Sequence, residues 1–292
     1  MDLLFRLAEC NIQISNLEEG INNLEKILQI TENTKHTSSI TIFRYKTYML
    51  IGAVSINIGD YSKALKSYTI AEGELTENLS EPELNMKLAS IYLNLGICYI
   101  HMNNASLAEK NFKKGLVQTE GMLGNEVIHK VILIIIYKLQ ADLNENMGIY
   151  NETINNPKEG LSFYKKSLKT KFHLYGENHD EVLDLQYKIA SVYITLKQLK
   201  EAEEIMLAMT DVVQNEKLNN STNMTKSNCI DNYYRYGVYF YTTGSILLKN
   251  NKSNLAKEFL RKAHVMWKDI VNPNDPGLSS IKSLLKICEK RI

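Results

Sequence analysis

The sequence predicts an all-α protein, a solenoid of helical hairpins closed by one further helix. Its 292 residues include only 4 Pro and 14 Gly, too few turn-forming residues for an all-β chain, which needs a turn about every ten residues. Pairs of small residues twelve positions apart also recur along the whole length. Sparse turn residues and a recurrent spacing together indicate a stack of similar helix–turn–helix units.

Six units share this spacing, and each carries a large side chain at the same offset. The small residues form the pairs Ala8/Gly20, Gly52/Ala64, Gly96/Ala108, Gly148/Gly160, Ala190/Ala202 and Gly244/Ala256. The large residue stands four positions after the second member of each pair, at Leu24, Tyr68, Phe112, Tyr164, Met206 and Leu260. Two antiparallel helices approach most closely where their side chains are small, and we expect the large residue to fill the gap against the neighbouring hairpin.

Turn-forming triplets separate the two small residues in four of the units, which places a tight turn between the helices of each hairpin. These triplets are residues 59–61, 103–105, 155–157 and 251–253. In order along the chain, we expect hairpins at about residues 1–30, 40–75, 83–122, 126–173, 180–213 and 230–270. We expect the hairpins to form a single domain over residues 1–292.

Three segments depart from a minimal unit. A long helix from about Glu126 to Tyr150 contains the run 131–136, which is apolar on all sides, so we expect that run to be buried between neighbouring helices. Residues 214–228 are polar and lack periodicity, which predicts a mobile loop. Residues 277–292 carry one apolar stripe, which predicts a helix that covers the end of the stack.

The paired small residues, each pair followed one turn later by a large residue, resemble the tetratricopeptide-repeat signature. Residues 174–205, LYGENHDEVLDLQYKIASVYITLKQLKEAEEI, are similar to the kinesin-light-chain subtype, including its inter-repeat turn at 175–181. The units are longer than the minimal repeat of about 34 residues, and the aromatic residue usual near the start of the first helix is replaced by Leu4, Asn144 and Gln186. The resemblance implies a right-handed superhelical solenoid of six tetratricopeptide-like hairpins with a C-terminal capping helix.

The first helices of such hairpins line the concave wall of the solenoid, which is the usual binding surface. The resemblance therefore implies a partner-binding groove formed by Phe5, Met49, Asn57, Leu93, Ile97, His101, Asp142, Glu145, Ile149, Glu152, Tyr187, Ser191, Tyr241 and Lys249. The wall also includes Ile12, Ile56, Ile100, Ile194 and Leu248 and is largely apolar, which favours an amphipathic helix or an extended apolar peptide as the ligand. Alternatively, a long helix of the chain itself or tight curvature fills part of the groove.

The groove lacks one feature of chaperone-binding tetratricopeptide proteins. An Asn directly after the first small residue is missing from every unit, so we expect no clamp for the C-terminal carboxylate of a chaperone. We expect specificity from Tyr187, Tyr241, Phe5 and the acidic trio of Asp142, Glu145 and Glu152. Removing both tyrosines should abolish partner capture while the helical content is kept.

Charge and cysteine usage exclude several classes of function. The chain has 34 Lys+Arg against 33 Asp+Glu, a formal charge of +1, which argues against nucleic-acid binding through bulk positive charge. The 4 Cys are dispersed without a CxxC pair and are typical of reduced thiols in the cytoplasm. The longest apolar run, Val131–Tyr137, spans seven residues, short of the roughly 20 that cross a bilayer, and no signal peptide is evident. We therefore expect a cytoplasmic protein without membrane insertion.

Catalytic and cofactor motifs are also missing from the sequence. It contains no G-x-G-x-x-G, P-loop, H-E-x-x-H or G-x-S-x-G pattern. His173 and His179 flank a turn with Glu177 and Asp180, but this arrangement resembles the family's capping turn more than a metal site. The tyrosines within 233–241 could stack on nucleobases, yet their place on a first helix favours packing. We therefore expect no enzyme, no cofactor and no metal.

These inferences predict a non-catalytic scaffold or adaptor that binds a protein or peptide partner. An alternative is a subunit or assembly factor of a larger complex, resembling the mitochondrial tetratricopeptide factor of respiratory complex III, which has similarly long units. A distant alternative is an enzyme with an unrecognised site. The sequence predicts no particular oligomeric state.

Overall fold

A computed structural model describes residues 1–32, 34, 37–75, 79–123, 130–218 and 226–291. These residues form helices joined by short turns, and no strand occurs among them. The all-α fold class predicted from the sequence is confirmed. The chain divides into two compact units, Met1–Asn156 and Pro157–Ile292. The single domain and the hairpin limits expected from the sequence stay predictions.

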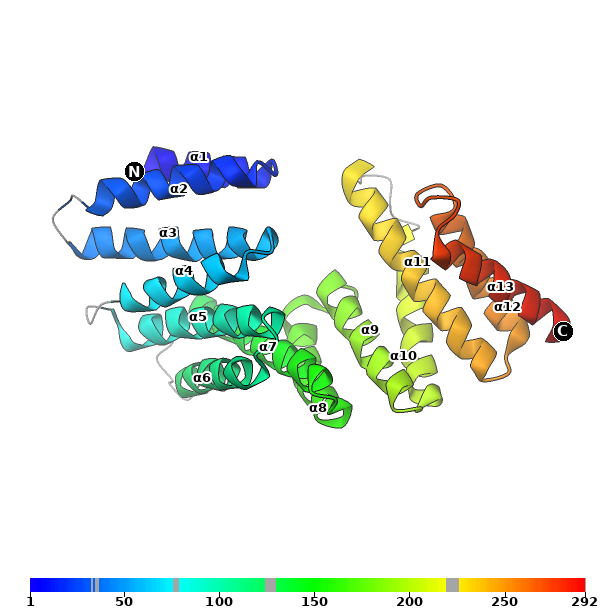
Figure 1. The fold of residues 1–292 in the computed structure, drawn as a ribbon. Helices are drawn as coiled ribbons and strands as arrows, with labels where there is room; N and C mark the ends of the chain where they lie inside the picture. Colours follow the sequence, from blue (N-terminus) through cyan, green and yellow to red (C-terminus); the bar gives the residue numbers. More distant parts are fainter. Residues whose placement is uncertain (33, 35–36, 76–78, 124–129, 219–225, 292) are drawn as a thin grey trace. The chain divides into compact units, whose positions relative to one another are not determined.

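Unit 1 consists of helices packed in consecutive pairs (Figure 1). Its helices are α1 (Asp2–Gln13), α2 (Leu17–Glu32), α3 (Ser38–Asn57), α4 (Tyr61–Gly73), α5 (Glu81–His101), α6 (Ala105–Leu123) and α7 (Lys130–Thr153). Helix α1 packs on α2, α3 on α4, and α5 on α6, while α7 packs against both α6 and α5. Hydrogen bonds join successive hairpins: the hydroxyl of Tyr92 donates to Glu72 at 2.8 Å and that of Tyr150 to Glu109 at 2.9 Å.

Unit 2 continues the alternation of helices. Its elements are α8 (Pro157–Tyr175), α9 (Asp180–Thr195), α10 (Leu199–Val212), the short π-helix η1 (Val213–Leu218), α11 (Lys226–Lys249), α12 (Ser253–Trp267) and α13 (Pro276–Arg291). Helix α9 packs on α8 and α10, and α11 packs on α10 and α12. Arg235 of α11 is held by two carboxylates of α9, Asp180 at 3.2 Å and Asp184 at 3.0 Å. The predicted terminal helix is confirmed as α13, which packs on α12.

The same backbone turn ends the first helix of every hairpin. One residue in the left-handed region, with φ between 56° and 80°, stands seven positions after each first small residue, at Ser15, Gly59, Asn103, Asn155, Lys197 and Asn251. The amide of the following residue donates to the carbonyl five residues earlier, for example from Asp60 to Ser55 at 2.8 Å. This is the hydrogen bond of a Schellman motif, which closes a helix and reverses the chain. The repeat found in the sequence is therefore also a repeat of backbone conformation.

The small residues of the repeat allow the close packing that their spacing predicts. A β-carbon added to Gly52 would lie 2.6 Å from the ring of Tyr68, and one added to Gly244 would lie 2.7 Å from Leu260. The large residue thus covers the small residue of its own hairpin, and Tyr68 also joins the core of the next hairpin. All six large residues are fully buried: Leu24, Tyr68, Phe112, Tyr164, Met206 and Leu260. One pair, formed by residues 148 and 160, has a member in each unit, and its packing stays a prediction.

The apolar run on α7 differs from the sequence-based expectation. Ile136 is buried as expected, but Val131, Ile134 and Ile135 are 59%, 51% and 41% exposed. Within unit 1, α7 packs against α5 and α6, which cover only one side of a run that is apolar on all sides. The prediction that the whole run is buried is therefore wrong. Residues 126–129, predicted as the start of this helix, lie outside the described residues.

The segment expected to be a mobile loop, residues 214–228, overlaps helices at both ends. Its first residues belong to η1, which directly follows α10, and its last residues belong to α11, which begins at Lys226. Residues 219–225 lie outside the part of the chain that the structure describes.

Candidate functional site

Ten of the residues predicted to line the groove belong to unit 1, on the first helices of its hairpins. These residues are Phe5, Met49, Asn57, Leu93, Ile97, His101, Asp142, Glu145, Ile149 and Glu152. Some of them contact other parts of the same unit. Phe5 lies with its ring centroid 5.5 Å from that of Phe43, and the exposed ring of His101 stacks on Tyr61 at 4.4 Å.

A pocket of about 350 Å³ lies between the first helices of unit 1. We call it the α5–α7 pocket, and its lining comes from α3, α5 and α7: Tyr45, Met86, Lys87, Ser90, Ile135, Lys138, Leu139 and Asp142. Of these residues, only Asp142 is in the set predicted from the sequence. The other lining residues occupy first-helix positions that the repeat alignment did not select.

Helical spacing explains why these side chains meet. Ile135, Lys138, Leu139 and Asp142 stand at i, i+3, i+4 and i+7 of α7, and such residues share one face of a helix. The corresponding face of α5 carries Met86, Lys87 and Ser90, and α5 and α7 are in contact. Two helix faces of mixed polarity therefore form the walls of the α5–α7 pocket.

Charged groups at the α5–α7 pocket are arranged beside a buried tyrosine. The ammonium of Lys87 lies 3.3 Å from Glu83 and 5.6 Å from the ring centroid of Tyr45. Burial raises the pKa of Tyr45 to about 12, so this phenol is neutral throughout the physiological range. The lining thus combines a neutral aromatic ring with charged groups of both signs, Lys87, Lys138 and Asp142.

An exposed apolar strip on α7 adjoins the α5–α7 pocket. The strip consists of Val131, Ile134 and Ile135, and Ile135 also lines the pocket. Residues at i, i+3 and i+4 lie on one side of a helix. Clustered large apolar side chains on a surface are typical of interaction sites.

Two of the four predicted groove residues of unit 2, Tyr187 and Tyr241, pack against its core. The Tyr187 ring lies 5.3 Å from that of Tyr239 and the Tyr241 ring 5.9 Å from that of Trp267. Both predicted tyrosines are half-buried and pack against the hydrophobic core of unit 2. Ser191 is half-buried on α9, and Lys249 is exposed at the end of α11.

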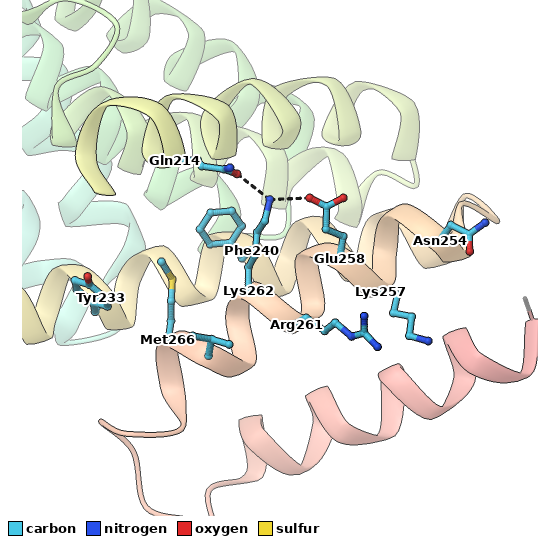
Figure 2. A pocket seen from close by; sticks show the side chains of 10 residues that line it. Gln214, Tyr233, Phe240, Asn254, Lys257, Glu258, Arg261, Lys262 and Met266 are labelled. Carbon is cyan, nitrogen blue, oxygen red and sulfur yellow. Dashed lines mark hydrogen bonds and ion pairs between the residues drawn. The ribbon is translucent and has the colours of Figure 1, made fainter. Parts of the chain in front are cut away.

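A second pocket, of about 600 Å³, lies over α12 in unit 2 (Figure 2). We call it the α12 pocket, and it is lined by Gln214, Tyr233, Phe240, Asn254, Lys257, Glu258, Arg261, Lys262, Val265 and Met266. The sequence analysis did not predict this site. The only sign of this site in the sequence is the spacing of its lining residues on α12. They recur every four positions in two neighbouring rows along the helix, Asn254–Glu258–Lys262–Met266 and Lys257–Arg261–Val265.

Ion pairs hold two of the three cations at the α12 pocket. Lys262 donates to Gln214 and to Glu258, both at 2.8 Å, and Figure 2 shows its ammonium between these two side chains. Lys257 lies 3.3 Å from Glu289 of α13. Arg261 is exposed, and none of the ion pairs between described residues involves it.

The turn before α9 has a structural role in helix capping. The Nδ1 atom of His179 accepts a hydrogen bond from the amide of Glu181 at 3.3 Å, and its ring stacks on Tyr175 at 4.6 Å. His179 is therefore the N-cap of α9. Within the described ranges, no three His, Cys, Asp or Glu side chains are grouped so that they could hold a metal ion. None of the helices that the structure describes is long and apolar enough to cross a membrane.

Consecutive hairpins with one recurring turn define a helical-repeat protein. Residues 183–210 match the family model of the tetratricopeptide repeat. They overlap, over residues 183–205, the segment that resembles the kinesin-light-chain subtype. These residues therefore form a tetratricopeptide repeat within a chain of helical hairpins.

Solved structures share this fold at low sequence identity. BtubC (BKLC) from P. vanneervenii is 14% identical with a TM-score of 0.68, and the match covers 89% of this chain and 94% of that one. A putative kinesin light chain with nearly identical tetratricopeptide-like repeats, from Podosopora anserina, is 12% identical with a TM-score of 0.57 and coverages of 81% and 98%. The assembly chaperone of RpL4 (Acl4) is 13% identical with a TM-score of 0.53 and coverages of 99% and 95%. Comparison with curated protein sequences gives no match.

Proposed function

We propose that the chain is a non-catalytic scaffold that binds a helical or extended segment of a partner protein at the α5–α7 pocket of unit 1. The observation that carries this proposal is the position of that pocket between first helices, beside the exposed strip of Val131, Ile134 and Ile135. Stacked helical hairpins commonly bind partners along the wall formed by their first helices. The fold of this chain is one that serves protein interaction in general.

Burial of the exposed strip would supply most of the binding free energy. Complete burial of one large aliphatic side chain is worth about 1.5–3 kcal/mol. An amphipathic partner helix could place its apolar face on Ile134 and Ile135 and an apolar side chain in the pocket. The charged residues Lys87, Lys138 and Asp142 would then set the direction and register of the partner.

The other first-helix residues predicted from the sequence would extend this surface within unit 1. We place Met49, Leu93, Ile97 and Ile149 in this proposed extension. The acidic residues Glu145 and Glu152 would favour a partner with basic residues at that end. The near-neutral charge of the chain and its 4 dispersed Cys support a protein partner, no nucleic acid, and a cytoplasmic location.

Affinity purification with matched variants tests the proposal. Tagged chain is recovered from the cells that produce it, and co-purifying chains are compared by mass spectrometry for the natural sequence, Ile135→Glu and Val117→Glu. Val117 is a suitable control because it is 62% exposed on α6 and is not among the residues that line the α5–α7 pocket. We expect Ile135→Glu alone to lose the partner. Equal recovery with Ile135→Glu would contradict the proposed site.

A second candidate function is that of an assembly factor or subunit of a larger complex. Its specific support is the shared fold with an assembly chaperone over 99% of this chain. An adaptor exchanges with its partner, whereas a subunit remains bound in fixed stoichiometry. Size-exclusion chromatography of the purified complex separates these cases, because a subunit would co-elute with its partner after dilution.

A further inference from the structure

We propose that the α12 pocket of unit 2 is a second binding site, for an acidic peptide segment that carries a large apolar side chain. The site is separate from the α5–α7 pocket, because all of its lining residues belong to unit 2. It therefore adds to the proposed function and can be tested independently of it.

The apolar part of the α12 pocket can receive a large side chain. Phe240 and Met266 are buried residues that form part of its lining, and Tyr233 adds a half-buried aromatic ring. Val265 is 60% exposed and stands at one end of the lining row on α12. The volume of about 600 Å³ lies within the range of roughly 300–1,000 Å³ typical of ligand pockets.

The charges at the α12 pocket favour an acidic ligand. Lys257, Arg261 and Lys262 carry positive charge along one face of α12, and Glu258 is the one carboxylate among the lining residues that the structure describes. Lys262 and Lys257 already have acidic partners, Glu258 and Glu289. The exposed guanidinium of Arg261 can bind a carboxylate through two parallel hydrogen bonds.

A peptide fits these observations better than a nucleic acid does. Binding to a phosphate backbone requires several cations that can each meet a phosphate. Two of the three cations at the α12 pocket are held in ion pairs within unit 2, which leaves Arg261 for a ligand. One guanidinium beside an apolar pocket matches one Glu or Asp beside a Leu or Phe.

Fluorescence anisotropy with the full chain and defined probes tests the site. The first probe is a fluorescein-labelled helical peptide with Leu and Phe one turn apart and Glu at the other exposed positions. Matched probes replace each Glu with Lys, or replace Leu and Phe with Ala. A labelled oligothymidylate tests nucleic-acid binding. We expect binding of the acidic apolar peptide alone, and weaker binding at high ionic strength.

Two variants on α12 and two matched controls locate the binding. Arg261→Glu should weaken binding of the acidic peptide about tenfold, since it replaces a charge attraction by a repulsion. Val265→Glu should weaken binding of this peptide to a similar extent. The controls are Lys169→Glu, at an exposed cation of α8, and Val117→Glu, at an exposed valine of α6. We expect both controls, and Ile135→Glu, to keep the affinity of the natural chain. Thermal unfolding followed by circular dichroism checks that every variant folds.

Several results would overturn the α12 site. They are no binding of the acidic apolar peptide, equal binding of its Lys version, preferred binding of the oligothymidylate, or an unchanged affinity in Arg261→Glu. If Ile135→Glu abolishes binding of the acidic peptide and Arg261→Glu does not, the peptide binds to unit 1. That outcome would overturn the second site and leave the proposed function standing.

Discussion

Gly96 of α5 lies directly beneath the ring of Phe112 of α6, so closely that a β-carbon on residue 96 would lie 2.3 Å from Cε1 of Phe112. Phe112 is fully buried, so its ring has little room to move aside. The contact explains the spacing of the repeat, because the small residue of the first helix accommodates the large residue of the second.

We expect Gly96→Ala to destabilise unit 1 despite the higher helix propensity of Ala. Overpacking of a buried contact typically costs about 1–3 kcal/mol, which exceeds the gain of roughly 1 kcal/mol from replacing a helical Gly. Urea unfolding followed by far-ultraviolet circular dichroism measures the change in the free energy of unfolding.

Gly121→Ala is the matched control for this change. Gly121 lies within α6 and is exposed, and a β-carbon added to it would meet no neighbouring atom within 4 Å. The same substitution should therefore stabilise the chain here, by about 1 kcal/mol. Similar stabilisation by both substitutions would show that the contact between Gly96 and Phe112 does not limit packing.

Lys197→Gly should stabilise unit 2. Lys197 adopts φ of 61° at the end of α9, a conformation that costs a non-glycine residue about 1 kcal/mol or more. Glycine adopts it without a steric penalty. The single Trp of the chain, Trp267, is buried in the core of unit 2, so its fluorescence during urea unfolding reports this change. Glu204→Gly, inside α10, should lower stability by about 1 kcal/mol, and equal effects of the two would contradict the turn argument.

The carboxyl group of Glu203 makes the stability of unit 2 depend on pH. Burial of this carboxyl raises its pKa, hydrogen bonds from Lys252 and Asn250 lower it, and the net pKa lies below the ordinary value of 4.5. A lowered folded-state pKa stabilises the fold above the pKa of the unfolded chain, and the stabilisation is lost as the pH falls through the folded-state pKa.

Glu203→Gln should therefore destabilise unit 2 at neutral pH, and the deficit should shrink as the pH falls below about 4. Trp267 fluorescence in urea, at a series of pH values, measures the difference. The exposed neighbour supplies the control, since Glu204→Gln should change little at any pH. A deficit that stays constant from neutral to acid pH would contradict the assignment.

Tyr187 and Tyr241 should contribute to stability, whatever their part in binding. Their rings contact Tyr239 and Trp267 within unit 2, and loss of a packed aromatic pair costs about 0.5–1.5 kcal/mol beyond the buried area. We expect the double alanine variant to keep its helical content at room temperature and to unfold at lower urea. An unchanged unfolding midpoint would show that these two rings do not stabilise unit 2.

The fold was predictable because its determinants are local. The spacing from Gly52 to Ala64 and Tyr68 marks the place where two helices of one hairpin pack closely. Gly59, seven positions after Gly52, has the left-handed conformation that ends the first of these helices. Each of these signals depends on residues of one hairpin, which a single sequence displays directly. The turn that contains His179 resembles the family's capping turn, and the structure places His179 at the N-cap of α9.

The surfaces were less predictable because they depend on what covers each helix. Ile135 belongs to a run that is apolar on all sides, and nothing in that run indicates that only one side is packed against α5 and α6. The α12 pocket combines Gln214, Tyr233 and Arg261 from three elements, and their proximity follows only from the tertiary packing.

The most direct test of the proposed function is site-specific photo-crosslinking from the α5–α7 pocket. A benzophenone amino acid replaces Ser90, which lines this pocket on α5, or Val117, which is exposed on α6. Irradiation of cells that produce each variant is followed by mass spectrometry of the crosslinked chains. The proposed function predicts a protein partner crosslinked from position 90 and not from position 117. Crosslinks from position 117 alone, or from neither position, would contradict it.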